Sequence, residues 1–297
     1  MRNNKILKVG ILFLLMTIVL EGLIYLIPST ILVKFDQYLS ILLPVLILAL
    51  IFKIDFKERF KLKGIKLSTV FFLVLITLFM LPISGFVGEL TTLVFGQNKF
   101  GINAYLESLD VSPFMIYFLI AVTPAICEEL MHRGLLLDLK APVSMHHLAI
   151  LSGIMFGLFH IGYDQVFYTA VMGYIIAYSV IITGSILPGI IIHLLNNSLS
   201  AMSLIFASGS SEVVETTTES VSILSMLPFA AFGALMIYFI YKKLIKDYNY
   251  DDKKRIEENL KESTKLQRSD SLTMYFPIIL VALYVLLVNL LLHYVGL

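Results

Sequence analysis

The sequence has little charge and almost no cysteine. Only 14% of its 297 residues are charged and 58% are hydrophobic, whereas a soluble domain averages about 25% charged and about 45–50% apolar residues. The single cysteine, Cys127, excludes an internal disulfide. The net charge is only +1, and no basic patch is interleaved with aromatic residues, so nothing points to a nucleic-acid partner. These absences predict a polytopic protein of the lipid bilayer.

A signal-peptide cleavage site and an internal repeat are also missing. The apolar run from Ile6 to Ile27 follows three basic residues, but it exceeds the roughly 7–15 residues of a signal-peptide core. We therefore expect a first transmembrane helix there. Without an internal repeat, an inverted-repeat transporter has little support.

The apolar runs predict an all-α fold, a polytopic transmembrane helical bundle of about eight or nine spans. The third run is longer than the ~20 residues needed to cross and contains Pro82, so we expect it to tilt or kink. The count becomes eight if the short fifth run is re-entrant. The expected spans are 6–27, 38–52, 68–95, 113 onward, 148–160, 166–182, 186–207, 223–241 and 272–294.

Basic residues cluster before the first span, between the second and third, after the fourth, and between the eighth and ninth. Nine crossings that start in the cytoplasm put all four clusters on the cytoplasmic side, as the positive-inside rule requires. We therefore expect a multi-pass protein of the cell membrane with a cytoplasmic N-terminus. The expected organisation is N-terminal helices (1–112), a core with the polar motifs (113–207), and C-terminal helices with a charged cytoplasmic loop (208–297).

The stretch from Ala125 to Gly134 places several charges inside a predicted span. A charge at the bilayer centre costs about 2.5–3.5 kcal/mol on insertion scales, so intramembrane ionisable residues indicate a functional site. A structural ion pair of Glu129 with Arg133, one helical turn apart, is the simpler interpretation, but it leaves Glu128 without a partner. We expect His132 at the lipid interface, with contact to Glu128 as the alternative.

Two further motifs place polar residues in apolar surroundings. Phe156 and His160 share one helix face, and the GxxxG over 153–157 lets a neighbouring helix approach closely. His193 and Asn197 share a face in the same way. Each motif alone is most simply a packing or hydrogen-bonding feature. If these histidines, the asparagine and the glutamates converge on one cavity, they can bind one another, which offsets the free-energy cost of placing each polar group in lipid.

Such a cavity can activate water. A glutamate paired with a histidine can take a proton from water, and histidines with a carboxylate can instead bind Zn²⁺ and activate a bound water. An asparagine amide and a histidine can donate hydrogen bonds to an oxyanion. These residue types favour hydrolysis of an amide bond without a serine or cysteine nucleophile, and they leave the zinc and metal-free alternatives open.

The motifs Glu-Glu-x-x-x-Arg, Phe-x-x-x-His and His-x-x-x-Asn, in this order, resemble the CPBP intramembrane proteases. This CAAX-processing and bacteriocin-processing group is also called the ABI family. The resemblance runs from about Thr123 to Leu199 and includes the linking segment from Thr183 to Gly189. It implies an intramembrane endopeptidase whose substrate is a membrane-associated peptide or a membrane-protein tail. It also implies that Glu129 and Arg133 support the geometry of the site.

The resemblance implies a catalytic role for four residues. Glu128 activates the water, His160 helps to hold it, and His193 and Asn197 stabilise the oxyanion. If the site is metal-dependent, the ligands of the zinc ion are Glu128, His160 and His193. The competing account is a glutamate mechanism without metal.

Two other functions compete with a peptidase. A non-enzymatic membrane scaffold or regulator, or a bacteriocin-immunity protein, can keep the same polar cluster for structural reasons. A transporter can use the glutamates as a proton relay. The complete motif set favours the peptidase, and the sequence indicates no particular oligomeric state.

Overall fold

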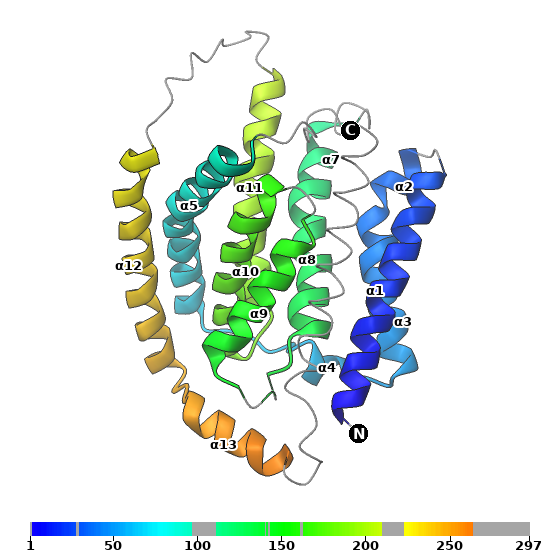
Figure 1. Ribbon diagram of the computed structural model, residues 1–297, viewed down its shortest axis with the longest axis vertical. Coiled ribbons are helices and arrows are strands. Elements are labelled where there is room, and N and C mark those ends of the chain that lie inside the picture. Colours follow the sequence, from blue (N-terminus) through cyan, green and yellow to red (C-terminus); the bar gives the residue numbers. More distant parts are fainter. Residues whose placement is uncertain are drawn as a thin grey trace.

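The computed structural model describes residues 2–27, 30–96, 111–139, 141, 143–160, 163–209 and 223–263. Within these ranges the secondary structure is helical, without strands, as the composition predicts. The long helices lie side by side along the long axis, and the N-terminus lies at the same end as α4 and α13 (Figure 1). In chain order the α-helices and the π-helical stretches, labelled η, are α1 (Arg2–Leu26), α2 (Thr30–Lys34), η1 (Gln37–Leu42), α3 (Leu43–Ile51), α4 (Phe56–Arg59), α5 (Leu67–Phe95), α7 (Pro113–Tyr117), η2 (Phe118–Val122), α8 (Thr123–Glu129), η3 (Leu130–Leu136), α9 (Met145–Leu158), α10 (Tyr163–Thr183), α11 (Leu187–Gly209), α12 (Ile223–Asp247) and α13 (Asp252–Ser263).

Five helices in the described ranges are long and apolar enough to cross a membrane, so the count of eight or nine is not confirmed. The expected second and fifth spans are shorter apolar helices, Gln37–Ile51 and Met145–Leu158. At 1.5 Å per residue, the 14 residues of α9 cover only about 21 Å of the roughly 30 Å hydrocarbon core. The expected span 272–294 lies outside the described residues. The five candidates are Leu67–Phe95, Pro113–Leu136, Gln165–Thr183, Leu187–Phe206 and Ile223–Asp247.

The helix over 113–136, here called the motif helix, carries the two glutamates and changes three times between α-helical and π-helical winding. Pro124 explains part of this irregularity, because its ring nitrogen has no N–H to donate to the carbonyl of Ile120. The resulting π-helical stretch η2 ends just before the α-helical turn that carries Glu128 and Glu129. π-helical turns of this kind occur frequently at functional sites.

Small residues bring α9 and α10 into close contact, as the GxxxG spacing predicts. A Cβ atom on Gly153 would lie 2.6 Å from the Ala170 carbonyl oxygen, and one on Gly157 would lie 2.4 Å from that of Val166. Both glycines therefore lie directly against the backbone of α10. This close packing fixes the part of α9 that carries Phe156.

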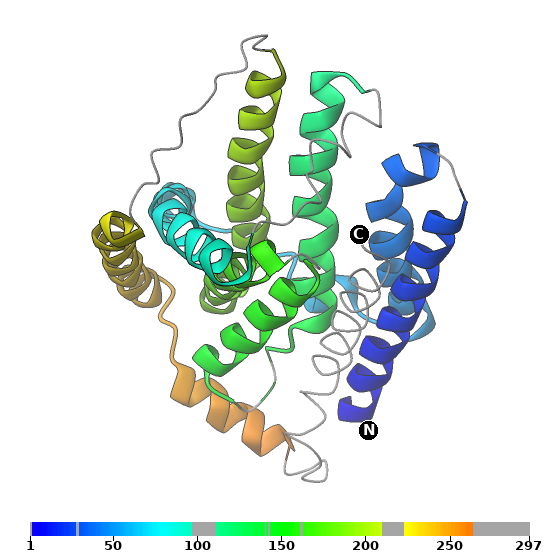
Figure 2. The same ribbon diagram turned by 45° about the horizontal axis from the view of Figure 1, so that its top comes forward.

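The motif helix and α11 contact each other and stand near the middle of the bundle. In the tilted view, α1 and α3 flank them on one side and α5 and α12 on the other (Figure 2). One apolar core includes Leu73 of α5, Ile176 of α10 and Leu244 of α12. A second core joins Phe13 of α1 to Met131 of η3. The polar motifs lie on helices that contribute to both cores.

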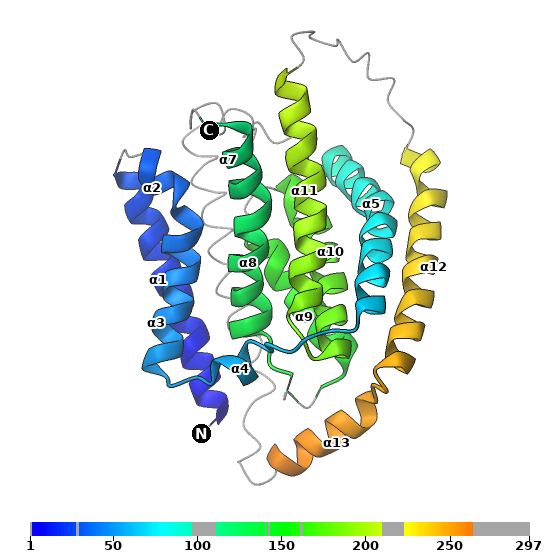
Figure 3. The same cartoon turned by 180° about the vertical axis from the view of Figure 1, so that it is seen from behind.

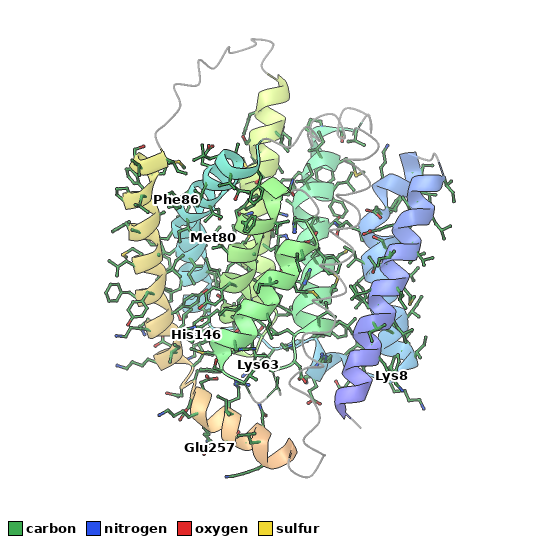
Figure 4. All side chains as sticks on the ribbon, in the orientation of Figure 1. Lys8, Lys63, Met80, Phe86, His146 and Glu257 are labelled. Atoms are coloured by element: carbon green, nitrogen blue, oxygen red, sulfur yellow. The ribbon has the colours of Figure 1, made fainter. Side chains whose placement is uncertain are left out.

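Charged side chains gather at one end of the bundle. Figure 4 places Lys8, Lys63 and Glu257 toward the end where α4 and α13 lie, and Phe86 toward the opposite end. The charged segment expected around 242–270 forms the end of α12 and the separate helix α13 within its described part. The sequence prediction that the basic loops share one side of the membrane is consistent with this arrangement.

Candidate active site

Glu129 and Arg133 form the ion pair that their spacing predicts. An Arg133 guanidinium nitrogen donates to Glu129 Oε1 at 2.6 Å, and both side chains are fully buried. The guanidinium also donates to the Gly173 carbonyl of α10 at 2.8 Å. Its carbon atom lies 4.7 Å from the ring centre of Phe156. Arg133 therefore ties the motif helix to both α9 and α10.

His193 of α11 lies between the two adjacent carboxylates. Its Nδ1 is 3.1 Å from Glu129 Oε1, and its Nε2 is 4.0 Å from Glu128 Oε2. An ionised carboxylate can only accept a hydrogen bond, so the contact with Glu129 assigns a proton to Nδ1. In the neutral ring, Nε2 is then an acceptor that faces Glu128. The structure thus joins two motifs that are 64 residues apart.

The second oxygen of Glu129 lies against the first turn of α11. A Cβ atom on Gly189 would lie 2.4 Å from Glu129 Oε2, so only glycine lets the carboxylate come this close. Glu129 Oε2 is buried and accepts no hydrogen bond in the described structure, and the helix dipole favours its negative charge at this end of α11. This contact gives a physical reason for a glycine at the end of the segment 183–189.

The ring of Phe156 contacts the guanidinium group of Arg133 and three imidazole rings. The ring centres of His160 and His193 lie 4.9 and 5.5 Å from it, and the His132 ring centre lies at 5.0 Å. His160 Nδ1 lies 2.9 Å from the Phe156 carbonyl oxygen, which fixes its ring. His160 therefore joins the cluster through Phe156, and no polar contact links it to Glu128 in the described part of the chain.

The expectation that His132 lies at the lipid interface is wrong. His132 is 2% exposed, and its ring packs edge-on against Phe156 and Phe159 at 5.0 and 5.1 Å. The π-helical winding of η3 and the packing of α9 turn this side chain inward. The alternative contact with Glu128 is also absent from the described structure, because the two aromatic rings occupy the space around the imidazole.

Asn197 contacts the motif helix two turns before the glutamates. Its Nδ2 donates to the Ile120 carbonyl at 3.1 Å, the group that Pro124 leaves without an α-helical donor. Its Oδ1 accepts from Asn196 Nδ2 at 3.2 Å. The amide nitrogen of asparagine has two hydrogens, so one remains for another acceptor. Asn197 thus has a structural contact in addition to its expected role.

Gln37 is a site residue that the sequence did not reveal. Its Nε2 donates to Glu128 Oε1 at 3.2 Å from η1, 91 residues earlier in the chain. Its Oε1 is buried and has no hydrogen-bond partner in the described structure. The only signal in the sequence was an amide at the start of an apolar run. This signal is too weak without knowing that η1 packs on α8.

The described side chains do not fit a zinc site. No three His, Cys, Asp or Glu residues within the described ranges are close enough together to hold a metal ion. His193 and His160 each have a partner on Nδ1, so Nε2 of each ring would be the nitrogen that binds a metal, and the Nε2 of His193 lies 4.0 Å from Glu128. The Glu128–His160–His193 ligand set is therefore not assembled here.

The comparison with known proteins agrees with the motif set. Residues 110–199 match a family model described as "Type II CAAX prenyl endopeptidase Rce1-like". This match confirms the resemblance to the CPBP family. The CPBP-like segment contains the motif helix, α9, α10 and the part of α11 that carries His193 and Asn197. The match implies a protease, and the apolar helices indicate a multi-pass membrane protein. No curated protein and no solved structure matches the chain.

Proposed function

We propose that this protein is an intramembrane endopeptidase in which Glu128 activates a water molecule for attack on a peptide bond. The observation that carries the proposal is the position of His193, tied through Nδ1 to Glu129 with its Nε2 4.0 Å from Glu128. This separation is too long for a direct hydrogen bond and suits a bridging water. Glu128 keeps some solvent access, because its side chain is 12% exposed.

The first step is proton transfer coupled to attack. Glu128 Oε2 and the acceptor Nε2 of His193 hold the two hydrogens of one water. As the water oxygen bonds to the scissile carbonyl carbon, its proton passes to Glu128, which is general-base catalysis worth about 10²–10⁴-fold. His160 donates from Nδ1 to the Phe156 carbonyl, which leaves its Nε2 an acceptor in the neutral ring, so it can accept a hydrogen of the water only in place of His193. Gln37 holds the other oxygen of Glu128 and keeps the carboxylate aligned.

The second step is collapse of the tetrahedral intermediate. Asn197 donates its remaining amide hydrogen to the oxyanion. The carbon–nitrogen bond then breaks, and the proton on Glu128 passes to the leaving amine. His193 can donate to the oxyanion only from a doubly protonated ring, so we assign it first to the water. The Glu129–Arg133 pair fixes the tautomer and orientation of His193.

For the substrate, we propose a membrane-associated peptide or the tail of a membrane protein. Support comes from the description of the matching family, a CAAX prenyl endopeptidase, and from helices suited to a bilayer. We further propose that the end carrying Lys8 and Lys63 faces the cytoplasm, because basic loops favour that side. The N-terminus and α13 then lie on the cytoplasmic side.

The test compares membrane-bound and secreted peptide pools from cells that carry the wild type or Glu128→Gln. The substitution keeps the shape of the side chain and removes the base. A precursor that accumulates while its product disappears supports the peptidase and identifies the substrate. The matched control is Glu89→Gln, at an exposed acidic residue of α5.

Equal peptide pools in wild type and Glu128→Gln contradict the proposal. If a deletion strain still has a phenotype in that case, the polar cluster is structural and the protein is a scaffold or regulator. Substrate flux that depends on a proton gradient, without a cleaved product, supports the transporter instead.

A further inference from the structure

Arg59 and Lys61, just before α5, contact the C-terminal end of the motif helix. Lys61 Nζ donates to the carbonyls of Arg133 and Leu137, at 3.2 Å for Leu137. Arg59 donates to the Leu135 carbonyl and lies 3.4 Å from Asp138 Oδ1. The last carbonyls of a helix have no partner within the helix, and the negative end of its dipole favours cations. The two cations therefore cap the helix that carries both glutamates.

Phe60, between the two cations, packs against the same helix end. It is 1% exposed, and a Cβ atom on Gly134 would lie 2.3 Å from its ring. The missing side chain of Gly134 therefore makes room for the aromatic ring. Three consecutive residues, 59–61, thus contact four positions at the end of the motif helix: Arg133, Gly134, Leu135 and Leu137.

The same segment also holds the beginning of α11. The Lys61 carbonyl accepts a hydrogen bond from the Ile186 N–H at 3.2 Å, and the Ser185 hydroxyl donates to the Lys63 carbonyl. Figure 3 shows the segment after α4 running beneath the ends of α8 and α11 on its way to α5. The turn it contacts contains Gly184 at φ +63°, a conformation that favours glycine. Lys61 itself has φ +53°.

We propose that Lys61 is a positioning residue that couples the motif helix to α11 and thereby sets the distance between Glu128 and His193. Its side-chain nitrogen donates to the end of the motif helix, and its backbone carbonyl accepts from Ile186 at the start of α11. Ile186 lies about two helical turns before His193, and the capped carbonyl of Arg133 belongs to the residue that holds Glu129. A displacement of about 1 Å between such groups can cost about 10²-fold in rate. The role of the coupling in catalysis presupposes the proposed peptidase, but the coupling itself does not.

The first test measures hydrogen–deuterium exchange in the full-length protein in detergent. In Lys61→Met, we expect exchange to rise about 5–30-fold in the peptide over 130–139, because the carbonyls of Arg133 and Leu137 lose their side-chain donor. We also expect exchange to rise in the peptide over 184–190, even though Lys61→Met keeps the backbone carbonyl that bonds Ile186. If Lys61 only caps the motif helix and does not couple it to α11, exchange should rise in the peptide over 130–139 alone. Lys57→Met, at an exposed lysine of α4, is the matched control and should leave both peptides unchanged.

The second test measures turnover of a synthetic farnesylated peptide with a C-terminal CAAX sequence. We expect Lys61→Met to lower kcat by about 10–100-fold at nearly constant KM, because Lys61 acts on the alignment of the site and not on substrate binding. Lys61→Arg keeps a cationic donor and should recover part of the loss. Lys61→Gln replaces Lys61→Met if the latter does not fold, with the same expected direction in both assays.

The outcomes separate this inference from the proposed function. Unchanged exchange over 184–190 in Lys61→Met overturns the coupling, whatever the peptide assay gives. A rise in both segments, with peptide turnover that is equal in wild type and Glu128→Gln, supports the coupling and refutes the peptidase. A rise in both segments with unchanged kcat overturns the positioning role.

Discussion

Removing the charge of Glu129 should destabilise the protein, because Arg133 would then remain buried without its counter-ion. Both side chains are fully buried and 2.6 Å apart. Breaking such a pair by changing one partner costs about 3–5 kcal/mol. Glu129→Gln keeps an oxygen that can accept from Arg133, so we expect the lower end, about 3 kcal/mol. At about 2 °C per kcal/mol for a larger chain, the unfolding midpoint falls by about 6 °C.

The only cysteine of the chain provides the assay. Cys127 is 1% exposed and two residues from Glu129, so a fluorogenic maleimide reacts with it only when this region opens. The labelling midpoint is measured against temperature in detergent for the wild type and Glu129→Gln. An unchanged midpoint refutes the reasoning, since it means that Arg133 does not need the carboxylate.

A double variant tests whether the pair itself is responsible. Glu129→Gln combined with Arg133→Met removes both charges, so it should recover more than half of the lost stability. Additive losses from the two single variants indicate that the residues act separately and contradict the buried-pair explanation.

Three further predictions concern the site and one concerns pH. Gln37→Leu should lower kcat about tenfold or more in the peptide assay, because Glu128 loses an aligning donor. Gly189→Ala should lower both stability and activity, because its methyl group would overlap the Glu129 carboxylate. Asn197→Ala should lower activity about 10²–10³-fold, as expected for one oxyanion donor. Burial, with Arg59 nearby, lowers the pKa of Lys61 from 10.5 to about 7 despite Asp138. Between about pH 7 and about pH 10, Lys61 is therefore protonated in the unfolded chain but largely neutral in the folded protein. The free energy of unfolding of the wild type, compared with that of Lys61→Met, should rise with pH over this range in thermal melts.

Matched variants separate these effects from general damage. Gly22→Ala is the control for Gly189→Ala, because a Cβ atom on Gly22 has no neighbour within 4 Å. Gln37→Glu keeps the size of Gln37 but replaces its donor with an acceptor, so it should be no more active than Gln37→Leu. Asn197→Ala should also lose some stability with its bond to the Ile120 carbonyl, so activity is compared per folded protein, and an activity that falls no further than the folded fraction contradicts the oxyanion role.

Local patterns in the sequence were sufficient for the helices and for contacts within one helix. Apolar runs predicted α5, α10, α11 and α12 closely, because hydropathy and length decide whether a segment can form a spanning helix. The Glu129–Arg133 pair followed from spacing alone. The close approach at 153–157 also followed, because only small residues let two backbones meet. The three motifs further predicted the family resemblance before any geometry was known.

The tertiary structure decided which of these polar groups meet. His193 contacts Glu129 across 64 residues, Gln37 contacts Glu128 across 91, and Lys61 contacts the Arg133 carbonyl across 72. No periodicity of the sequence encodes such contacts, because they depend on how η1, α11 and the segment before α5 pack on the motif helix. The inward position of His132 has the same origin, since the rings of Phe156 and Phe159 pack against it. The sequence by itself determined the membrane class and the residues available for catalysis, and helix packing determined their arrangement.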